Sequence, residues 1–124
     1  EIYTLSLHDA LPISSLRWMY ENTAVYCFPS LSEGFGLPGL EAMLHGAPVA
    51  SSTATCLPET HGDAACYFDP YDVEDIARVI DELLTNQPLR NELIAKGKKH
   101  AHSFSWQRMA EQTLAVYNKY GRKL

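Results

Sequence analysis

The sequence lacks several features that mark specialised classes of protein. Within its 124 residues, no apolar run approaches the roughly 20 residues that a membrane-spanning helix needs. We find no secretory signal-peptide pattern, no internal repeat and no low-complexity segment. A chain of this length is expected to form at most one small domain, which we place in the cytoplasm.

Cysteine is scarce, and its three positions, Cys27, Cys56 and Cys66, form no Cys-x-x-Cys pair. The odd number and the mostly apolar neighbours predict buried, free thiols in a reducing compartment, rather than a disulfide between Cys27 and Cys66. The chain also lacks a Ser/His/Asp or Cys/His nucleophile pattern and any metal-ligand spacing, so we expect no metal and no cofactor. His100 and His102 would point apart on a helix, which predicts two surface residues.

Basic residues are nearly absent from the first two thirds of the chain. Residues 1–85 hold two basic and 13 acidic side chains, whereas residues 86–124 hold eight basic and two acidic ones. The simpler interpretation is that the two parts offset each other within one fold. The alternative is that the basic part faces an anionic membrane or a lipid-linked acceptor, which would make the protein membrane-associated. The basic residues are not interleaved with aromatic repeats, so we expect no nucleic-acid partner.

A glycine-rich turn, residues 33–39, is the feature around which the rest of the chain is organised. Its sequence, Glu-Gly-Phe-Gly-Leu-Pro-Gly, follows an apolar run of strand length at residues 24–28 and precedes a helical stretch at residues 40–45. A strand, a glycine-rich turn and a helix N-terminus together present backbone N–H groups to phosphate. Gly34 and Gly36 allow a close approach or a positive φ, and Pro38 suits the first helical position.

Two carboxylates border this turn. We place Glu33 in the turn itself and Glu41 in the first turn of the following helix. Because helical side chains lean toward the N-terminus, Glu41 is expected to reach the pocket that Glu33 overlooks. That pocket would combine N–H donors for a diphosphate, one carboxylate for a ribose diol and one carboxylate near a sugar.

The remaining pattern predicts alternating strands and helices, and therefore an α/β fold whose parallel strands are covered on both faces. Beyond the stretches already named, we predict helices at residues 16–22, 73–84, after Asn86 and at 106–120, strands at 49–53 and 64–68, and a helical turn at Pro58-Glu59.

Several single residues carry further predictions about these helices. We predict N-caps at Asp72, completed by Asp75, and at Asn86 and Ser105. Leu84 is predicted to belong to the apolar stripe of the helix at residues 73–84. Gly97 is expected to bend or weaken its helix, and Trp106 to anchor the last helix by packing.

The two glutamates form a Glu-x7-Glu pattern within a longer series of motifs. The series contains Pro29-Ser30, the glycine-rich turn, Glu41-Ala42-Met43, Gly-Ala-Pro-Val-Ala at residues 46–50 and Leu-Pro-Glu at residues 57–59. In this order it resembles the C-terminal part of the nucleotide-sugar-dependent retaining glycosyltransferases of family 4, over residues 16–120. The resemblance implies a partial Rossmann-like parallel sheet, formed by the last strands of a GT-B C-terminal domain, with flanking helices.

The resemblance also implies a function and a set of site residues. The expected reaction moves a sugar, with mannose as the preferred candidate, from a nucleotide-diphosphate donor to a hydroxyl of a glycan or lipid-linked acceptor, with retention. Glu33 would be the catalytic residue beside the donor sugar, as nucleophile or as orienting group, and Glu41 would bind the ribose hydroxyls. The backbone that holds donor oxygens would be that of Gly34, Phe35, Gly36 and Leu37.

Other readings of the same fold stay open at this point. The family places an arginine and a lysine upstream of the motif, whereas the only basic residue upstream here is Arg17, to which we assign no such role. The alternatives are a non-catalytic nucleotide-binding module and a nucleotide-sugar epimerase of similar fold. We expect this chain to be inactive by itself, because the acceptor-binding domain of the family is not part of it.

The first residues do not fit this pattern. Residues 3–13, Tyr-Thr-Leu-Ser-Leu-His-Asp-Ala-Leu-Pro-Ile, resemble an in-frame translation of a common short-read sequencing adapter. We therefore interpret residues 1–14 as a non-native segment and residues 15–124 as the C-terminal part of a nucleotide-sugar-binding domain. An ordinary amphipathic start is the alternative.

Overall fold

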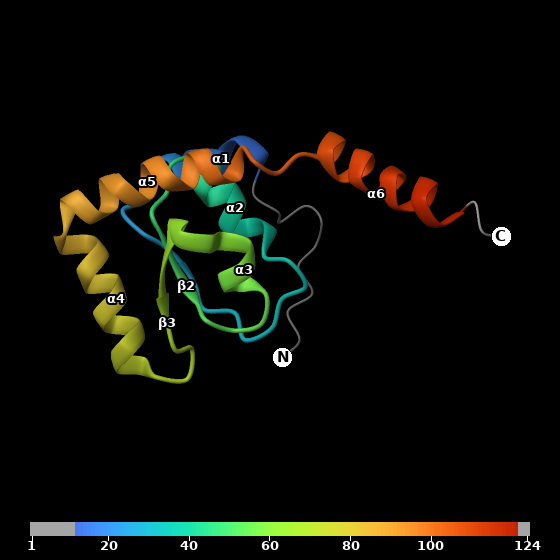
Figure 1. The fold of residues 1–124 in the computed structure, drawn as a ribbon. Helices are drawn as coiled ribbons and strands as arrows, with labels where there is room; N and C mark the ends of the chain where they lie inside the picture. The colour runs from blue at the N-terminus through green and yellow to red at the C-terminus, as the bar shows by residue number, and fades with distance from the viewer. Residues whose placement is uncertain (1–11, 122–124) are drawn as a thin grey trace.

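The computed structural model describes residues 12–121, so the predicted non-native segment lies almost entirely outside the described residues. At its centre is a parallel sheet of three strands, β1 (Tyr26–Phe28), β2 (Val49–Ser52) and β3 (Ala65–Phe68), in the order β1-β2-β3 (Figure 1). The predicted α/β class with a parallel sheet is confirmed, and the strands fall within their predicted ranges.

Helices alternate with these strands along the chain. α1 precedes β1, α2 connects β1 to β2, and α3 with a short 3₁₀ turn, η1, connects β2 to β3. Three more helices follow the sheet. The bounds are α1 (Ile13–Asn22), α2 (Leu37–Leu44), α3 (Leu57–His61), η1 (Gly62–Ala64), α4 (Val73–Thr85), α5 (Gln87–Ala101) and α6 (Trp106–Tyr120).

Apolar side chains from the two faces of the sheet form two clusters. Successive residues of β2 point to opposite faces and so belong to different clusters. Val49 belongs to the cluster with α1 and α2, and Ala50 to the cluster with α4 and the start of α5. Every residue of β2 is buried, as expected for a central parallel strand. Leu84, which the sequence assigned to the apolar stripe of α4, is 48% exposed, because the stripe narrows to Val79 and Leu83 at the sheet.

The predicted caps of the last three helices are present, with one difference. The Asp72 carboxylate accepts hydrogen bonds from the N–H groups of Glu74 and Asp75, at 3.0 and 3.2 Å. The Asp75 carboxylate does not return to Asp72; it accepts from the Asp69 N–H at 2.8 Å and pairs with Arg78. Asp75 therefore ties the end of β3 to α4 instead of closing a capping box.

Gly97 serves close packing between two helices. We predicted that Gly97 bends or weakens its helix, and the structure shows that α5 runs unbroken past it from Gln87 to Ala101. A Cβ placed on Gly97 would lie 3.1 Å from Cγ of Met43, on α2. The absence of a side chain at Gly97 therefore lets α5 approach α2 closely.

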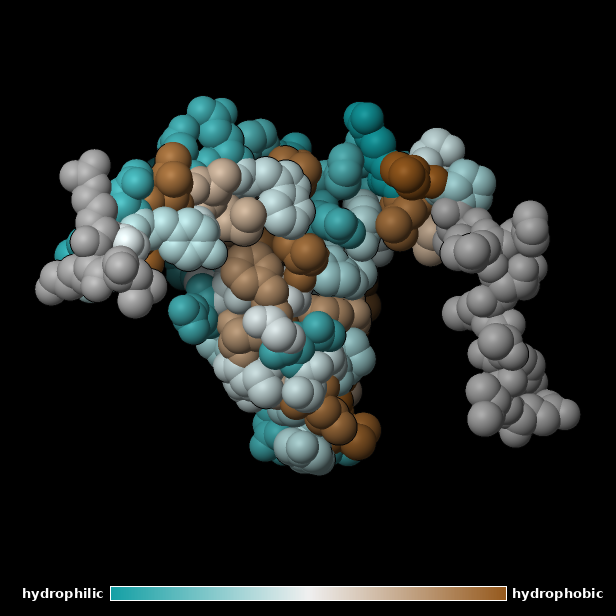
Figure 2. All heavy atoms as spheres, turned by 90° about the vertical axis from the view of Figure 1, so that its right-hand side faces the viewer, coloured by the Kyte–Doolittle hydropathy of each residue, from teal (hydrophilic) through white to brown (hydrophobic). Residues whose placement is uncertain are grey.

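α6 stands away from the rest of the described chain (Figure 1). None of its residues is buried against residues 12–121, and Trp106, predicted to be a packing anchor, is 76% exposed. Figure 2 views the molecule from the side of α6 and shows apolar side chains open to solvent among polar ones. The large exposed apolar residues of α6 are Trp106, Met109, Leu114, Val116, Tyr117 and Tyr120.

The three cysteines are free thiols, as predicted, but they are partly rather than fully buried. Cys27 and Cys66 both lie opposite Ala50, on the two strands that flank β2. The intervening strand separates the two thiols, and burial raises the pKa of each. No helix within residues 12–121 is long and apolar enough to cross a bilayer.

We expect residues 14–124, expressed by themselves, to self-associate. β1 is an edge strand of three residues and α6 buries none of its apolar side chains, so both present surfaces for association. Size-exclusion chromatography with light scattering should show oligomers, and thermal unfolding should be broad. A monomer with a sharp cooperative transition would contradict this expectation.

Candidate functional site

The glycine-rich turn connects the C-terminal end of β1 to the N-terminus of α2. Gly36 is the N-cap of α2 and has a left-handed conformation, with φ 87° and ψ 39°. A side chain at this position would be strained, and its Cβ would also press against Leu57. Because α2 begins at Leu37, Pro38 occupies the second helical position instead of the predicted first one.

A network of hydrogen bonds orients Glu33 in the turn. Its carboxylate accepts from the Ser30 hydroxyl at 2.8 Å, and its N–H donates to Thr55 Oγ1 at 3.1 Å. Cys56 Sγ lies 3.3 Å from the Glu33 carbonyl oxygen. The loops that follow β1 and β2 therefore both hold Glu33 in place. Glu33 lies at the carboxyl edge of the sheet, where α/β proteins bind ligands. Thr55 itself adopts a left-handed φ of 51° to make the contact.

Glu41 is exposed on the second turn of α2, so its predicted place in the first turn is wrong. The left-handed Gly36 caps the helix earlier than expected, which moves Glu41 one turn along. The negative charge of Glu41 affects the pKa of two tyrosines. Burial is the main cause of the raised pKa values of Tyr20 and Tyr26, and the Glu41 carboxylate adds to both shifts.

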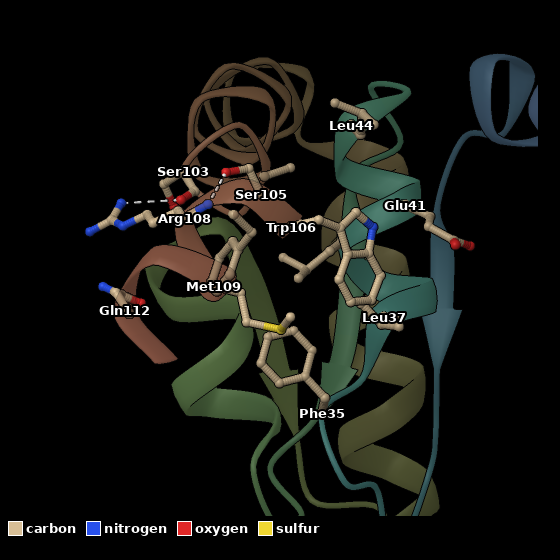
Figure 3. Close-up of a pocket in the computed structure, with 13 residues that line it drawn as sticks. Phe35, Leu37, Glu41, Leu44, Ser103, Ser105, Trp106, Arg108, Met109 and Gln112 are labelled. Carbon is tan, nitrogen blue, oxygen red and sulfur yellow. Dashed lines mark hydrogen bonds between the residues drawn. The ribbon is translucent and has the colours of Figure 1, made fainter. Parts of the chain in front are cut away.

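A groove of about 900 Å³ lies between α2, the turn after α5 and the start of α6 (Figure 3). Three predicted site residues, Phe35, Leu37 and Glu41, line it, whereas Glu33, Gly34 and Gly36 do not. The lining residues are Phe35, Leu37, Leu40, Glu41, Leu44, Ala101, Ser103, Phe104, Ser105, Trp106, Arg108, Met109 and Gln112. The structure therefore brings the glycine-rich turn and Glu41 to one region but does not place both glutamates in one cavity.

The two sides of this groove are joined by aromatic contacts. The rings of Phe35 and Phe104 meet edge to face with centroids 5.8 Å apart, and His100 meets Phe104 in the same way at 5.2 Å. The prediction that His100 is a surface residue is wrong: it is partly buried, and its Nε2 lies 2.8 Å from the Thr60 carbonyl oxygen. His102 is exposed, as predicted.

The structure adds one polar residue beneath the turn that the sequence did not single out. His61, at the end of α3, is fully buried and lies 3.1 Å from both the Gly36 carbonyl oxygen and Ser51 Oγ. The only sequence signal was the pair of glycines three positions apart, Gly36 and Gly39, which leaves room for a ring beneath the backbone.

Two charge features bear on anion and metal binding. Arg17, to which we assigned no role with a diphosphate, is paired with Glu21 on α1 at 2.7 Å. Within residues 12–121, no group of three or more histidine, cysteine, aspartate or glutamate side chains is placed to hold a metal ion.

A parallel α/β sheet with a glycine-rich turn at a helix N-terminus is typical of nucleotide-binding domains. Residues 8–100 match the family model described as "Glycosyl transferases group 1", and the chain belongs to this family. The resemblance drawn from the Glu-x7-Glu pattern is thereby confirmed.

Individual relatives agree with this assignment. The O-antigen chain mannosyltransferase B of Escherichia coli is 40% identical over 107 residues, which are 86% of this chain and 28% of that protein. The MMP alpha-(1->4)-mannosyltransferase of Mycolicibacterium hassiacum is 42% identical over 128 residues, covering 95% of this chain and 31% of that protein.

The fold is similar to that of a solved GT-B enzyme. The sucrose-phosphate synthase of Thermosynechococcus elongatus superposes with a TM-score of 0.79 at 26% sequence identity, covering 92% of this chain and 29% of that one. The chain thus spans less than a third of the length of the relatives it matches. The predicted GT-B fold and the membership of this chain in a glycosyltransferase family are confirmed.

Proposed function

We propose that the protein containing this chain transfers mannose from a nucleotide-diphosphate donor to an acceptor hydroxyl, with retention of anomeric configuration. The observation that carries the proposal is the glycine-rich turn, which caps α2 through Gly36 beside the fixed carboxylate of Glu33. The mannosyltransferase names of the relatives favour mannose over other hexoses. The donor and the retention remain parts of the proposal.

Each site residue has a role in this proposal. The N-terminus of α2 offers N–H groups and a partial positive charge to donor oxygens, through the backbone of Gly34, Phe35, Gly36 and Leu37. Glu33 lies beside the donor sugar and stabilises the positive charge that develops at the anomeric carbon. Glu41 binds the ribose hydroxyls. The reaction then depends on donor positioning and leaving-group stabilisation, with no metal or cofactor.

The acceptor is a glycan or a lipid-linked glycan in this proposal. Residues 86–124 carry a net charge of +6, which favours approach to an anionic membrane surface or an anionic acceptor. The apolar groove beside Trp106 and Phe35 lies next to the turn, where an acceptor chain would meet the donor sugar.

The proposal is tested by incubating the full-length protein with GDP-mannose and mannosyl acceptors, with and without EDTA. We expect transfer in both conditions, and NMR of the first product should show the anomeric configuration of the donor. Inverted product would refute retention. Nucleotide binding without transfer would favour a binding module, and interconversion of nucleotide sugars would favour an epimerase.

A further inference from the structure

We propose that His61 is a positioning residue for donor binding. Its ring holds the Gly36 carbonyl, and this contact directs the Leu37 N–H toward the side of the turn where the donor oxygens would bind. The inference deepens the proposed function and rests on it. His61 comes from α3, a different element from the turn, and its side chain is fully buried beneath the start of α2.

The hydrogen bonds of His61 define its protonation. A carbonyl oxygen can only accept, so Nε2 carries the proton and donates to Gly36 at 3.1 Å. In the neutral ring, Nδ1 then accepts from the Ser51 hydroxyl at 3.1 Å. Burial lowers the pKa of His61; the hydrogen bond to Gly36 opposes this shift and the charge of His100 adds to it. Burial thus favours the neutral ring, and the Gly36 carbonyl favours the tautomer with the proton on Nε2.

The peptide bond between Gly36 and Leu37 links the contact with His61 to the direction of the Leu37 N–H. The Gly36–Leu37 peptide is trans, so its C=O and N–H groups point in opposite directions. With the carbonyl directed at the buried ring, the Leu37 N–H points away from the core. This N–H is the first of α2 and has no acceptor within the helix. Leu37 itself is 49% exposed and lines the groove.

Close packing around the His61 ring restricts the position of the turn. A Cβ on Gly39 would overlap the His61 ring, and a Cβ on Gly36 would lie 3.4 Å from Nε2. The Phe28 ring packs on another side, with centroids 6.0 Å apart. Both glycines thus let the backbone rest directly on the imidazole. The Gly36 carbonyl is held from two sides, by His61 and by the Gly39 N–H, which donates to it at 3.2 Å.

The test compares two variants of the full-length protein that differ in one donor group. In His61→Gln the amide N–H2 can donate from about the position of Nε2, whereas His61→Met has a similar volume and no donor. With GDP-mannose as the probe, we expect His61→Met to raise the donor KM about tenfold and His61→Gln to stay near wild type. Equal KM values in the two variants would overturn the proposal.

A matched control separates positioning from stability. Ser51→Ala removes the partner of Nδ1 but leaves the contact with Gly36, so it should lower Tm and leave the donor KM unchanged. If Ser51→Ala and His61→Met raise KM in proportion to their loss of Tm, His61 is only a structural residue and the proposal fails.

Two further outcomes keep the two proposals distinct. ¹⁵N NMR of the histidine rings in the wild-type protein should show His61 neutral with its proton on Nε2, and a proton on Nδ1 instead would refute the contact even if the variants do not fold. Absence of transfer in the wild-type protein would refute the proposed function and, with it, the donor role of His61. Transfer in wild type with unchanged KM in His61→Met would refute only the positioning role.

Discussion

Replacing Glu33 with glutamine in the full-length protein is expected to lower kcat about 100-fold while changing the donor KM by less than about threefold. Glutamine keeps an oxygen that can accept from the Ser30 hydroxyl, so the hydrogen bonds that hold the residue survive the substitution. What is lost is the negative charge. That charge interacts more strongly with the transition state than with the bound donor, because positive charge develops at the anomeric carbon only during transfer.

Steady-state kinetics at varied donor concentration checks this expectation. Glu74→Gln is the matched control, since Glu74 is an exposed glutamate on α4 that is not among the residues lining the groove. It should leave both constants unchanged. If Glu33→Gln keeps kcat within about twofold of wild type while folding normally, Glu33 is not the catalytic residue.

Glu41→Ala is expected to act on binding, with a 10- to 100-fold increase in the donor KM and little change in kcat. Removing a charged hydrogen-bonding partner costs about 1.5–3 kcal/mol, which corresponds to this range. The ribose is remote from the bond that breaks, so the contact is equal in the ground and transition states and the loss appears in KM. Glu41 is exposed on α2, so alanine there removes a contact without opening a cavity.

The comparison of the two variants also tests the division of roles. Donor titration by calorimetry should show weaker binding for Glu41→Ala and near-normal binding for Glu33→Gln. A silent Glu33→Gln together with a Glu41→Ala that abolishes kcat would mean that the two roles are reversed. If neither substitution changes a kinetic constant, the Glu-x7-Glu pattern forms only a turn.

The sheet and most of the helices could be predicted because their signals are local. Continuous apolar runs bounded by proline and glycine predicted the strands, and the side chains of Asp72, Asn86 and Ser105 cap their helices as expected. The glycine-rich turn was found for the same reason. Its cap at Gly36 starts α2 early, however, and this shift explains why Glu41 lies on the second turn.

The features that the sequence did not predict all depend on contacts between distant segments. His61 is buried because the glycines of the turn leave space for its ring, and no local pattern around α3 contains that information. His100 is partly buried because it reaches the Thr60 carbonyl. Trp106 has the composition of a packing residue, but nothing in the described part of the chain covers it.

The contact between Gly97 and Met43 has a consequence for how a ligand would be received. At this point only the Met43 side chain lies between α5 and α2, and we expect such close packing to make the two helices move together. Because the glycine-rich turn leads directly into α2, we expect its backbone groups to be held in place before a ligand arrives. A pre-organised site of this kind loses little conformational entropy on binding, so more of the interaction energy remains as affinity.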